Sequence, residues 1–151
     1  MSAFDRLKLH SHATDAMRAL AGVEDILAQS TLDPLLRHLI KLRASQINGC
    51  AFCVTMHLAE AREDAESEER LDHLVVWREV ALFSAAERAA LAWTEALTRL
   101  DAPADLGRLH EALSRHFGEA ETATLTTAIG MINLWNRLMV ASHRDQPRLA
   151  A

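Results

Sequence analysis

The only two cysteines of the chain lie three positions apart, and a histidine follows the second one at a distance of four residues. If a helix begins at the Asn48-Gly49 turn, Cys50, Cys53 and His57 occupy positions i, i+3 and i+7 on one helix face. The partial positive charge of a helix N-terminus favours the reactive thiolate. An imidazole one turn later can accept or return a proton. The spacing therefore predicts thiol redox chemistry.

Two other interpretations of the cysteine pair stay open. Free cysteines are often buried and inert, so the pair could belong to the core. Alternatively, Cys50, Cys53 and His57 could supply three zinc ligands, with His38 as the fourth. Structural zinc sites commonly use two ligand pairs separated by a loop, whereas three of these candidates share one predicted helix. The pattern accordingly favours a catalytic dithiol.

Composition restricts the classes of function and the location. The 151 residues fit one domain, half of them apolar and a quarter charged, as in an ordinary globular protein. A net charge of −5 argues against nucleic acid as a partner. The chain shows no membrane-spanning apolar run and no signal peptide, so we expect a cytoplasmic protein that does not bind membranes. A Cys-x-x-Cys pair in that compartment is more often catalytic or metal-binding than structural.

The segments that must position these residues are predicted to be helical, because period-2 strand patterns are hard to find and proline and glycine are scarce. We therefore predict an all-α bundle of about six to seven helices in a single domain, 1–151. The acidic run Glu60–Glu69 is interpreted as a solvent-exposed helix face followed by a loop. The first five expected helices span about 13–29, 34–48, 50–63 (with the cysteines), 67–80 and 85–100 (after a capping box at Ser84). A sixth follows the break at Asp101-Ala102-Pro103 and ends at Gly118, and the last spans about 119–143.

The last predicted helix has apolar residues around much of its circumference, which indicates a buried core helix or a helix at a subunit contact. Asn133, Asn136 and Arg137 lie within this apolar surface. Buried polar groups need hydrogen-bond partners, so we expect these side chains to form a satisfied network or a pocket wall.

Three segments of the chain resemble AhpD-like alkylhydroperoxidases of the carboxymuconolactone decarboxylase superfamily. They read LRASQINGCAFCVTMH, WREVALFSAAERAALAWTEALT and IGMINLWNRL, and the resemblance covers about residues 13–143. It implies an all-α bundle that assembles into homo-oligomers, commonly dimers, trimers or hexamers. It also implies an antioxidant peroxidase whose only redox group is a Cys50–Cys53 disulfide, without a separate cofactor.

The resemblance also implies a role for each motif residue. Cys53 matches the peroxidatic thiol, which attacks a hydroperoxide and becomes a sulfenic acid. Cys50 matches the resolving thiol, and His57 matches the relay histidine. The partners implied are a small hydroperoxide and a dithiol electron donor, such as a lipoyl-bearing or thioredoxin-like protein.

One position departs from the family pattern. The relay glutamate usually lies twelve residues before the first motif cysteine, where this chain has His38. His38 could act as a neutral base or as a cation that stabilises a thiolate, or it could leave the relay broken. It would also complete a Cys2His2 zinc set. One alternative is thus a non-catalytic or weakly active member that senses redox state or binds zinc. The other is a carboxymuconolactone-type decarboxylase, whose chemistry does not use a Cys-x-x-Cys pair, so the two cysteines count against it.

Overall fold

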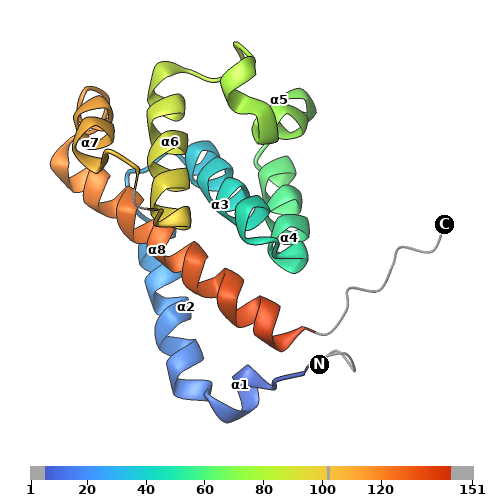
Figure 1. Cartoon of the computed structure of the whole chain (residues 1–151). Helices are drawn as coiled ribbons and strands as arrows, with labels where there is room; N and C mark the ends of the chain where they lie inside the picture. The colour runs from blue at the N-terminus through green and yellow to red at the C-terminus, as the bar shows by residue number, and fades with distance from the viewer. Residues whose placement is uncertain (1–5, 102, 144–151) are drawn as a thin grey trace.

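The computed structural model describes residues 6–101 and 103–143, and this part of the chain is helical without any β-strand (Figure 1). The prediction of an all-α bundle is confirmed. The elements are α1 (Leu9–His12), α2 (Thr14–Ala28), α3 (Pro34–Asn48), α4 (Ala51–Glu63), α5 (Glu68–His73), the 3-10 helix η1 (Leu74–Glu79), α6 (Ala85–Arg99), α7 (Leu106–Ser114) and α8 (Glu119–Ser142).

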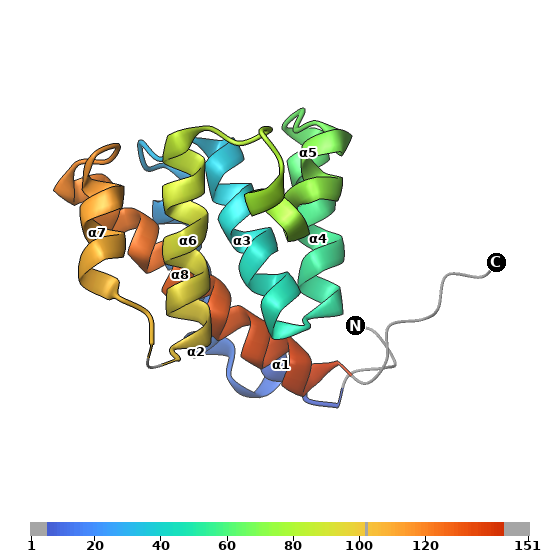
Figure 2. The same ribbon diagram turned by 45° about the horizontal axis from the view of Figure 1, so that its top comes forward.

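Helix α3 is the central element of the bundle. It contacts α4, α6 and α8, and Figure 2 shows α6, α3 and α4 side by side with α8 crossing beneath them. Pro34 starts α3 in its first turn, where the missing N–H costs nothing, and the side chain of Asp33 accepts a hydrogen bond from the Leu35 N–H. The long C-terminal helix α8 and the cysteine-bearing helix α4 are thus both packed against one helix.

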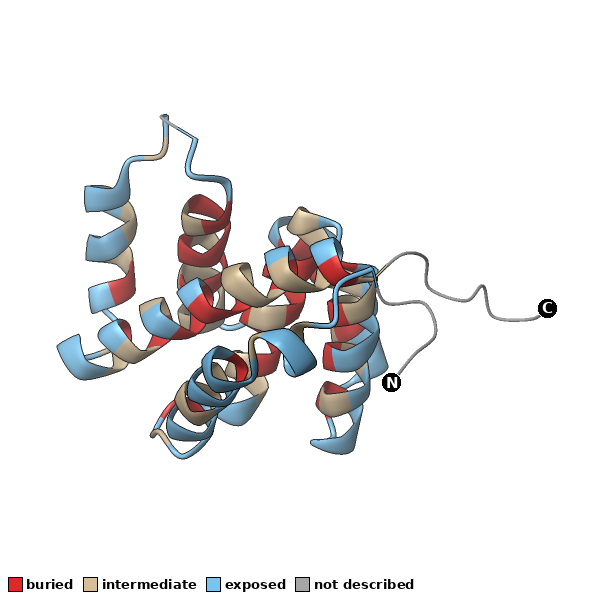
Figure 3. Ribbon diagram, turned by 90° about the horizontal axis from the view of Figure 1, so that it is seen from below, coloured by how far each residue is buried: buried red, intermediate tan, exposed pale blue. Residues whose placement is uncertain are grey.

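Two hydrophobic clusters lie on different faces of α3. Leu36 and Ile40 are four residues apart and pack with residues of α6, α7 and α8, whereas Leu39 and Leu42 pack with residues of α4, α5, η1 and α6. All four leucine and isoleucine side chains are at most 3% exposed. Figure 3 shows the buried residues on the inner faces of the helices. Because α3 has core on two sides, it forms a rigid support for α4.

Most predicted helices lie within about two residues of the observed ones. Ser67 and Ser84 cap α5 and α6 as expected, and Glu87 completes a capping box with Ser84. The predicted helix 67–80 instead divides into α5 and η1, with Val76 in a non-helical conformation. This break leaves Val75 and Val76 exposed and buries Trp77, whose Nε1–H donates to Glu95 at 2.9 Å.

Two further differences concern helix ends. The sixth predicted helix was expected to end at Gly118, but α7 ends at Ser114 and Gly118 is the N-cap of α8, where its N–H donates to Glu121. The short helix α1 was not predicted. It contains histidines at positions 10 and 12 but has no buried residue, so it lacks the apolar periodicity that reveals a helix.

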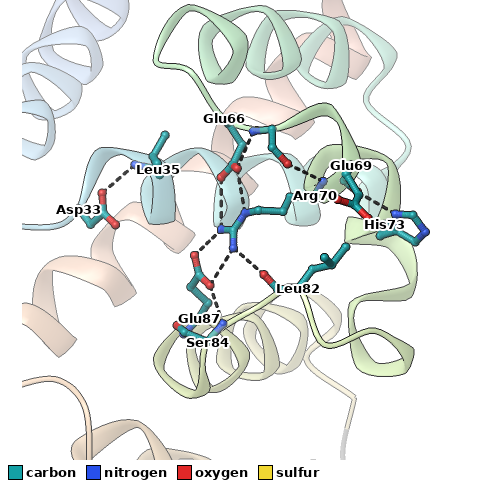
Figure 4. A network of polar contacts seen from close by, with 10 residues as sticks. Asp33, Leu35, Glu66, Glu69, Arg70, His73, Leu82, Ser84 and Glu87 are labelled. Atoms are coloured by element: carbon teal, nitrogen blue, oxygen red, sulfur yellow. Dashed lines mark hydrogen bonds and ion pairs between the residues drawn. The ribbon is translucent and has the colours of Figure 1, made fainter.

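Two buried carboxylates connect the elements around this core. Arg70 donates to Glu66, Glu87 and the carbonyl oxygen of Leu82, which ties α5 to the start of α6 (Figure 4). Glu95 of α6 is 3% exposed and accepts hydrogen bonds from Arg43 of α3, from Trp77 and Arg78 of η1, and from Arg99. The Glu95 network fixes η1 and α6 against α3, whereas the Arg70 network fixes α5 against α6.

In the residues that the structure describes, no helix has the length and apolarity that crossing a membrane requires.

Candidate active site

The cysteines follow a tight turn between α3 and α4. Helix α3 ends at Asn48, and Gly49 adopts the left-handed conformation with φ of 66°, which glycine enters without the steric cost of a side chain. Cys50 is then the N-cap of α4, and its Sγ accepts a hydrogen bond from the Cys53 N–H at 3.3 Å. The Asn48-Gly49 turn is therefore what places both cysteines at the N-terminus of a helix, as predicted.

Cys50 and Cys53 form a disulfide bond, with 5.3 Å between their Cα atoms. Both are buried, with at most 2% of their surface exposed. The pair is therefore oxidised in this structure and enclosed by protein.

A network of amide side chains holds the turn against α8. Asn48 Nδ2 donates to the Oδ1 atoms of Asn136 at 2.8 Å and Asn133 at 3.0 Å, and Asn136 Nδ2 donates to Ser45 Oγ at 2.9 Å. Asn133 also donates to Thr98 of α6, and Arg137 donates back to Asn133. The expectation of a satisfied network around these α8 residues is confirmed, and the network holds the end of α3, two residues before Cys50, against α8.

Cys53 and His57 line the same cavity, which has a volume of about 420 Å³. The two residues are four apart on α4, so their side chains share one helix face. The wall combines an apolar part with several ionisable groups. It is formed by His10, Ala21, Glu24, Asp25, Lys41, Phe52, Cys53, Met56, His57, Glu60, Ile132, Trp135 and Met139.

His57 is 3% exposed and pairs with the carboxylate of Glu60, with 2.8 Å between Nδ1 and Oε2. The hydrogen bond from His57 lowers the pKa of Glu60 more than burial raises it, and the charges of His57, Lys41 and His38 lower it further. An ionised Glu60 can only accept, so Nδ1 of His57 carries the proton. Nε2 is buried and lacks a hydrogen-bond partner within the described residues.

A second carboxylate of the cavity wall, that of Glu24, is paired with a lysine and a tryptophan. Glu24 of α2 accepts from Lys41 Nζ at 2.5 Å and from Trp135 Nε1 at 3.0 Å. These three residues come from α2, α3 and α8, so their contacts join the three helices that form the wall opposite α4. Lys41 is therefore paired rather than available as a free cation at the thiols.

His38 makes its contact with a different carboxylate of the same region. Its Nε2 is 2.6 Å from Oδ2 of Asp64, at the far end of α4, and it is outside the lining of the cavity formed by the described residues. Cys50 and Cys53 are bonded to each other and His38 is paired with Asp64, so in this structure these side chains do not form the hypothetical Cys2His2 zinc set. Across 6–101 and 103–143, no group of three or more histidine, cysteine or acidic side chains is arranged to hold a metal ion.

Sequence reasoning missed several residues of the site. Glu60 was interpreted as part of a solvated acidic run, but it pairs with His57, and Glu66 of the same run is buried against Arg70. The spacing i, i+3 between His57 and Glu60 was the available signal. Glu24, Lys41 and Trp135 are separated by long stretches of chain, and no local pattern connects them.

A sequence model of the carboxymuconolactone decarboxylase family matches residues 11–96, which is more than half of the chain. The chain belongs to this family. Its AhpD-like character is supported by an Agrobacterium tumefaciens protein, ATU0492, described as a candidate antioxidant defence protein AhpD. That structure is 39% identical, has a TM-score of 0.84, and the match covers 94% of this chain and 99% of that one.

Two further proteins are similar to this chain, one in sequence and one in fold. YdfG of Bacillus subtilis is 35% identical over 136 residues, which cover 90% of this chain and 92% of YdfG. The debrominase Bmp8 has the same fold, with a TM-score of 0.74 at 20% identity over 91% of this chain and 74% of Bmp8. Because a debrominase has this fold, the fold alone does not assign a reaction, and the activity of this chain has to be argued from its own site.

Proposed function

We propose that this protein is a thiol-dependent hydroperoxide reductase, in which Cys53 reduces the substrate and Cys50 closes the disulfide. The observation that carries the proposal is the shared cavity of Cys53 and His57. A thiol needs a proton acceptor to become a nucleophile, and a buried imidazole with an unpartnered nitrogen, one turn away, meets that need.

The reaction would begin with reduced Cys50 and Cys53. The Cys53 thiolate attacks the terminal oxygen of ROOH, so the S–O bond forms while the O–O bond breaks, and the leaving alkoxide takes a proton to become ROH. The Cys50 thiol then attacks the sulfenic acid and water leaves. Two thiols thereby supply the two electrons that reduce the hydroperoxide, and the product is the Cys50–Cys53 disulfide present in the structure.

A dithiol donor would complete the cycle by thiol–disulfide exchange. One donor thiolate attacks the disulfide, and the second donor thiol displaces the mixed disulfide, which returns both cysteines to the reduced form. The cavity gives a donor of small cross-section, such as a lipoyl group, a route to Cys53. The apolar wall of Phe52, Met56, Ile132 and Met139 suits organic hydroperoxides better than hydrogen peroxide.

Single cysteine variants test the proposal. Cys53→Ser should abolish consumption of cumene hydroperoxide in the presence of a dithiol. Reduced Cys50→Ser protein should react once and form a sulfenic acid at Cys53, which a dimedone adduct reveals by mass spectrometry. An adduct on Cys50 in Cys53→Ser protein, together with an unreactive Cys53 in Cys50→Ser protein, would reverse the assignment of the two thiols.

A further inference from the structure

We propose that Glu60 is the positioning residue of the site, holding His57 in the tautomer whose Nε2 is free to accept the Cys53 proton. This inference rests on the proposed function and gives a role to a residue outside the Cys-x-x-Cys-x-x-x-His motif. Glu60 would thereby supply the carboxylate of a proton relay whose usual glutamate position is occupied by His38.

The first argument is the geometry of the hydrogen bond. Oε2 of Glu60 is 2.8 Å from Nδ1 of His57, and both residues lie on α4 with spacing i, i+3. Because the contact lies within a single helix, its formation does not depend on the packing of another element. With Nδ1 donating to Glu60, the only lone pair of the ring is on Nε2.

The second argument is that the His57 side chain is buried whereas the Glu60 side chain is not. The His57 side chain is 4% exposed, whereas that of Glu60 is 44% exposed. The carboxylate therefore remains hydrated and ionised while the imidazole is enclosed. An anion beside a buried imidazole stabilises the imidazolium that forms when His57 takes a proton.

The third argument comes from the alternative carboxylate on the same helix. Asp64 lies one turn after Glu60 and makes an analogous contact with His38 at 2.6 Å. His38 is outside the cavity lining given by the described residues, whereas Glu60, His57 and Cys53 all belong to it. Of the two carboxylate–histidine pairs, the Glu60–His57 pair is the one that shares a cavity with the thiol.

Other charges also face His57 and Glu60. Lys41 of α3 is paired with Glu24 of α2, so their charges largely cancel at the cavity wall. His38 of α3 lies close enough to influence Glu60. The remaining ionisable groups of the wall are Asp25 of α2 and His10 of α1. Within this set, Glu60 is the anion in direct contact with His57.

The test measures the reactivity of Cys53 without requiring turnover. In reduced Cys50→Ser protein, the rate of alkylation of Cys53 by iodoacetamide is followed from pH 5 to 10, with and without Glu60→Gln. We expect Glu60→Gln to move the midpoint about one unit to higher pH, equivalent to roughly ten-fold slower alkylation below the midpoint. The matched control Asp64→Asn removes the analogous charge one turn away and should leave the midpoint in place.

Two results would overturn the inference. One is an unchanged midpoint in Glu60→Gln, and a shift seen in Asp64→Asn alone would in addition assign the relay to His38. The other needs no variant: ¹⁵N NMR of the native protein should find Nδ1 of neutral His57 protonated, and the opposite tautomer would contradict the proposal. If native protein fails to reduce cumene hydroperoxide while alkylation behaves as expected, the proposed function fails and the role of Glu60 stands.

Discussion

Asn48 and Asn136 are 88 residues apart in sequence, yet the Nδ2 of the first lies 2.8 Å from the Oδ1 of the second. This hydrogen bond joins the last residue of α3 to the buried face of α8, and Cys50 follows two residues later. The position of the cysteine pair is therefore determined by the C-terminal helix as well as by the turn that precedes it.

Replacing Asn136 by alanine should destabilise the protein by about 2–3 kcal/mol. The substitution removes an acceptor for Asn48 and a donor for Ser45 at a site that is 1% exposed, and buried polar groups left without partners are costly. Urea unfolding gives the value. Asn133→Ala is the matched control, with an expected loss of about 1 kcal/mol because Asn133 is only half-buried. Equal losses would contradict a special role for Asn136.

Because Glu95 is a buried carboxylate, we expect the free energy of unfolding to depend on pH in the acidic range. Burial raises its pKa, but hydrogen bonds from Trp77, Arg78 and Arg43 outweigh that effect and lower the pKa to about 2. A group whose pKa is lowered on folding contributes stability above its unfolded value, near 4.5, and loses it as the pH falls toward about 2. The contribution at neutral pH is on the order of 3 kcal/mol.

The stability difference between native protein and Glu95→Gln measures this contribution. Unfolding in urea should show the full difference at pH 7, and the difference should shrink between about pH 4.5 and pH 2.5. A difference that stays constant across this range would mean that the carboxylate charge does not contribute.

Phe52 is predicted to limit the length of the substrate. Together with His10 and Met139 it lines both the cavity at Cys53 and an adjacent cavity of about 140 Å³, and its ring stacks on His143 with 4.5 Å between centroids. Phe52→Ala should connect the two spaces. The ratio of kcat/KM for a long-chain alkyl hydroperoxide to that for tert-butyl hydroperoxide should rise about ten-fold, as expected for a few additional buried methylenes.

Met56→Ala is the control for this substitution, because Met56 lines only the cavity at Cys53 among the two cavities described. Met56→Ala enlarges the cavity at Cys53 but leaves the Phe52 ring between the two cavities. A similar change of the ratio in both variants would show that Phe52 acts through volume alone.

The fold could be predicted from local signals. Pro34, Ser67 and the Ser84 capping box marked helix starts, and apolar periodicity gave the length of α2, α3 and α6. The break after α5 could not be predicted, because it accompanies the burial of Trp77 and its contact with Glu95, which is 18 residues away in sequence. Tertiary contacts override local propensity there.

The site could be predicted only in part. The positions of Cys50 and Cys53 at a helix start and of His57 one turn later followed from spacing. The pairing of His38 with Asp64 and of Glu24 with Lys41 and Trp135 depends on how α2, α3, α4 and α8 pack, which no sequence motif records. The participation of His38 in catalysis stays a prediction.

The central claim is that Cys50 and Cys53 form a redox pair that reduces hydroperoxides. The most direct measurement is a count of free thiols in reduced, chelator-treated protein before and after one equivalent of cumene hydroperoxide. The account predicts loss of both thiols, with recovery after addition of a dithiol. Retention of both thiols in folded protein would contradict it.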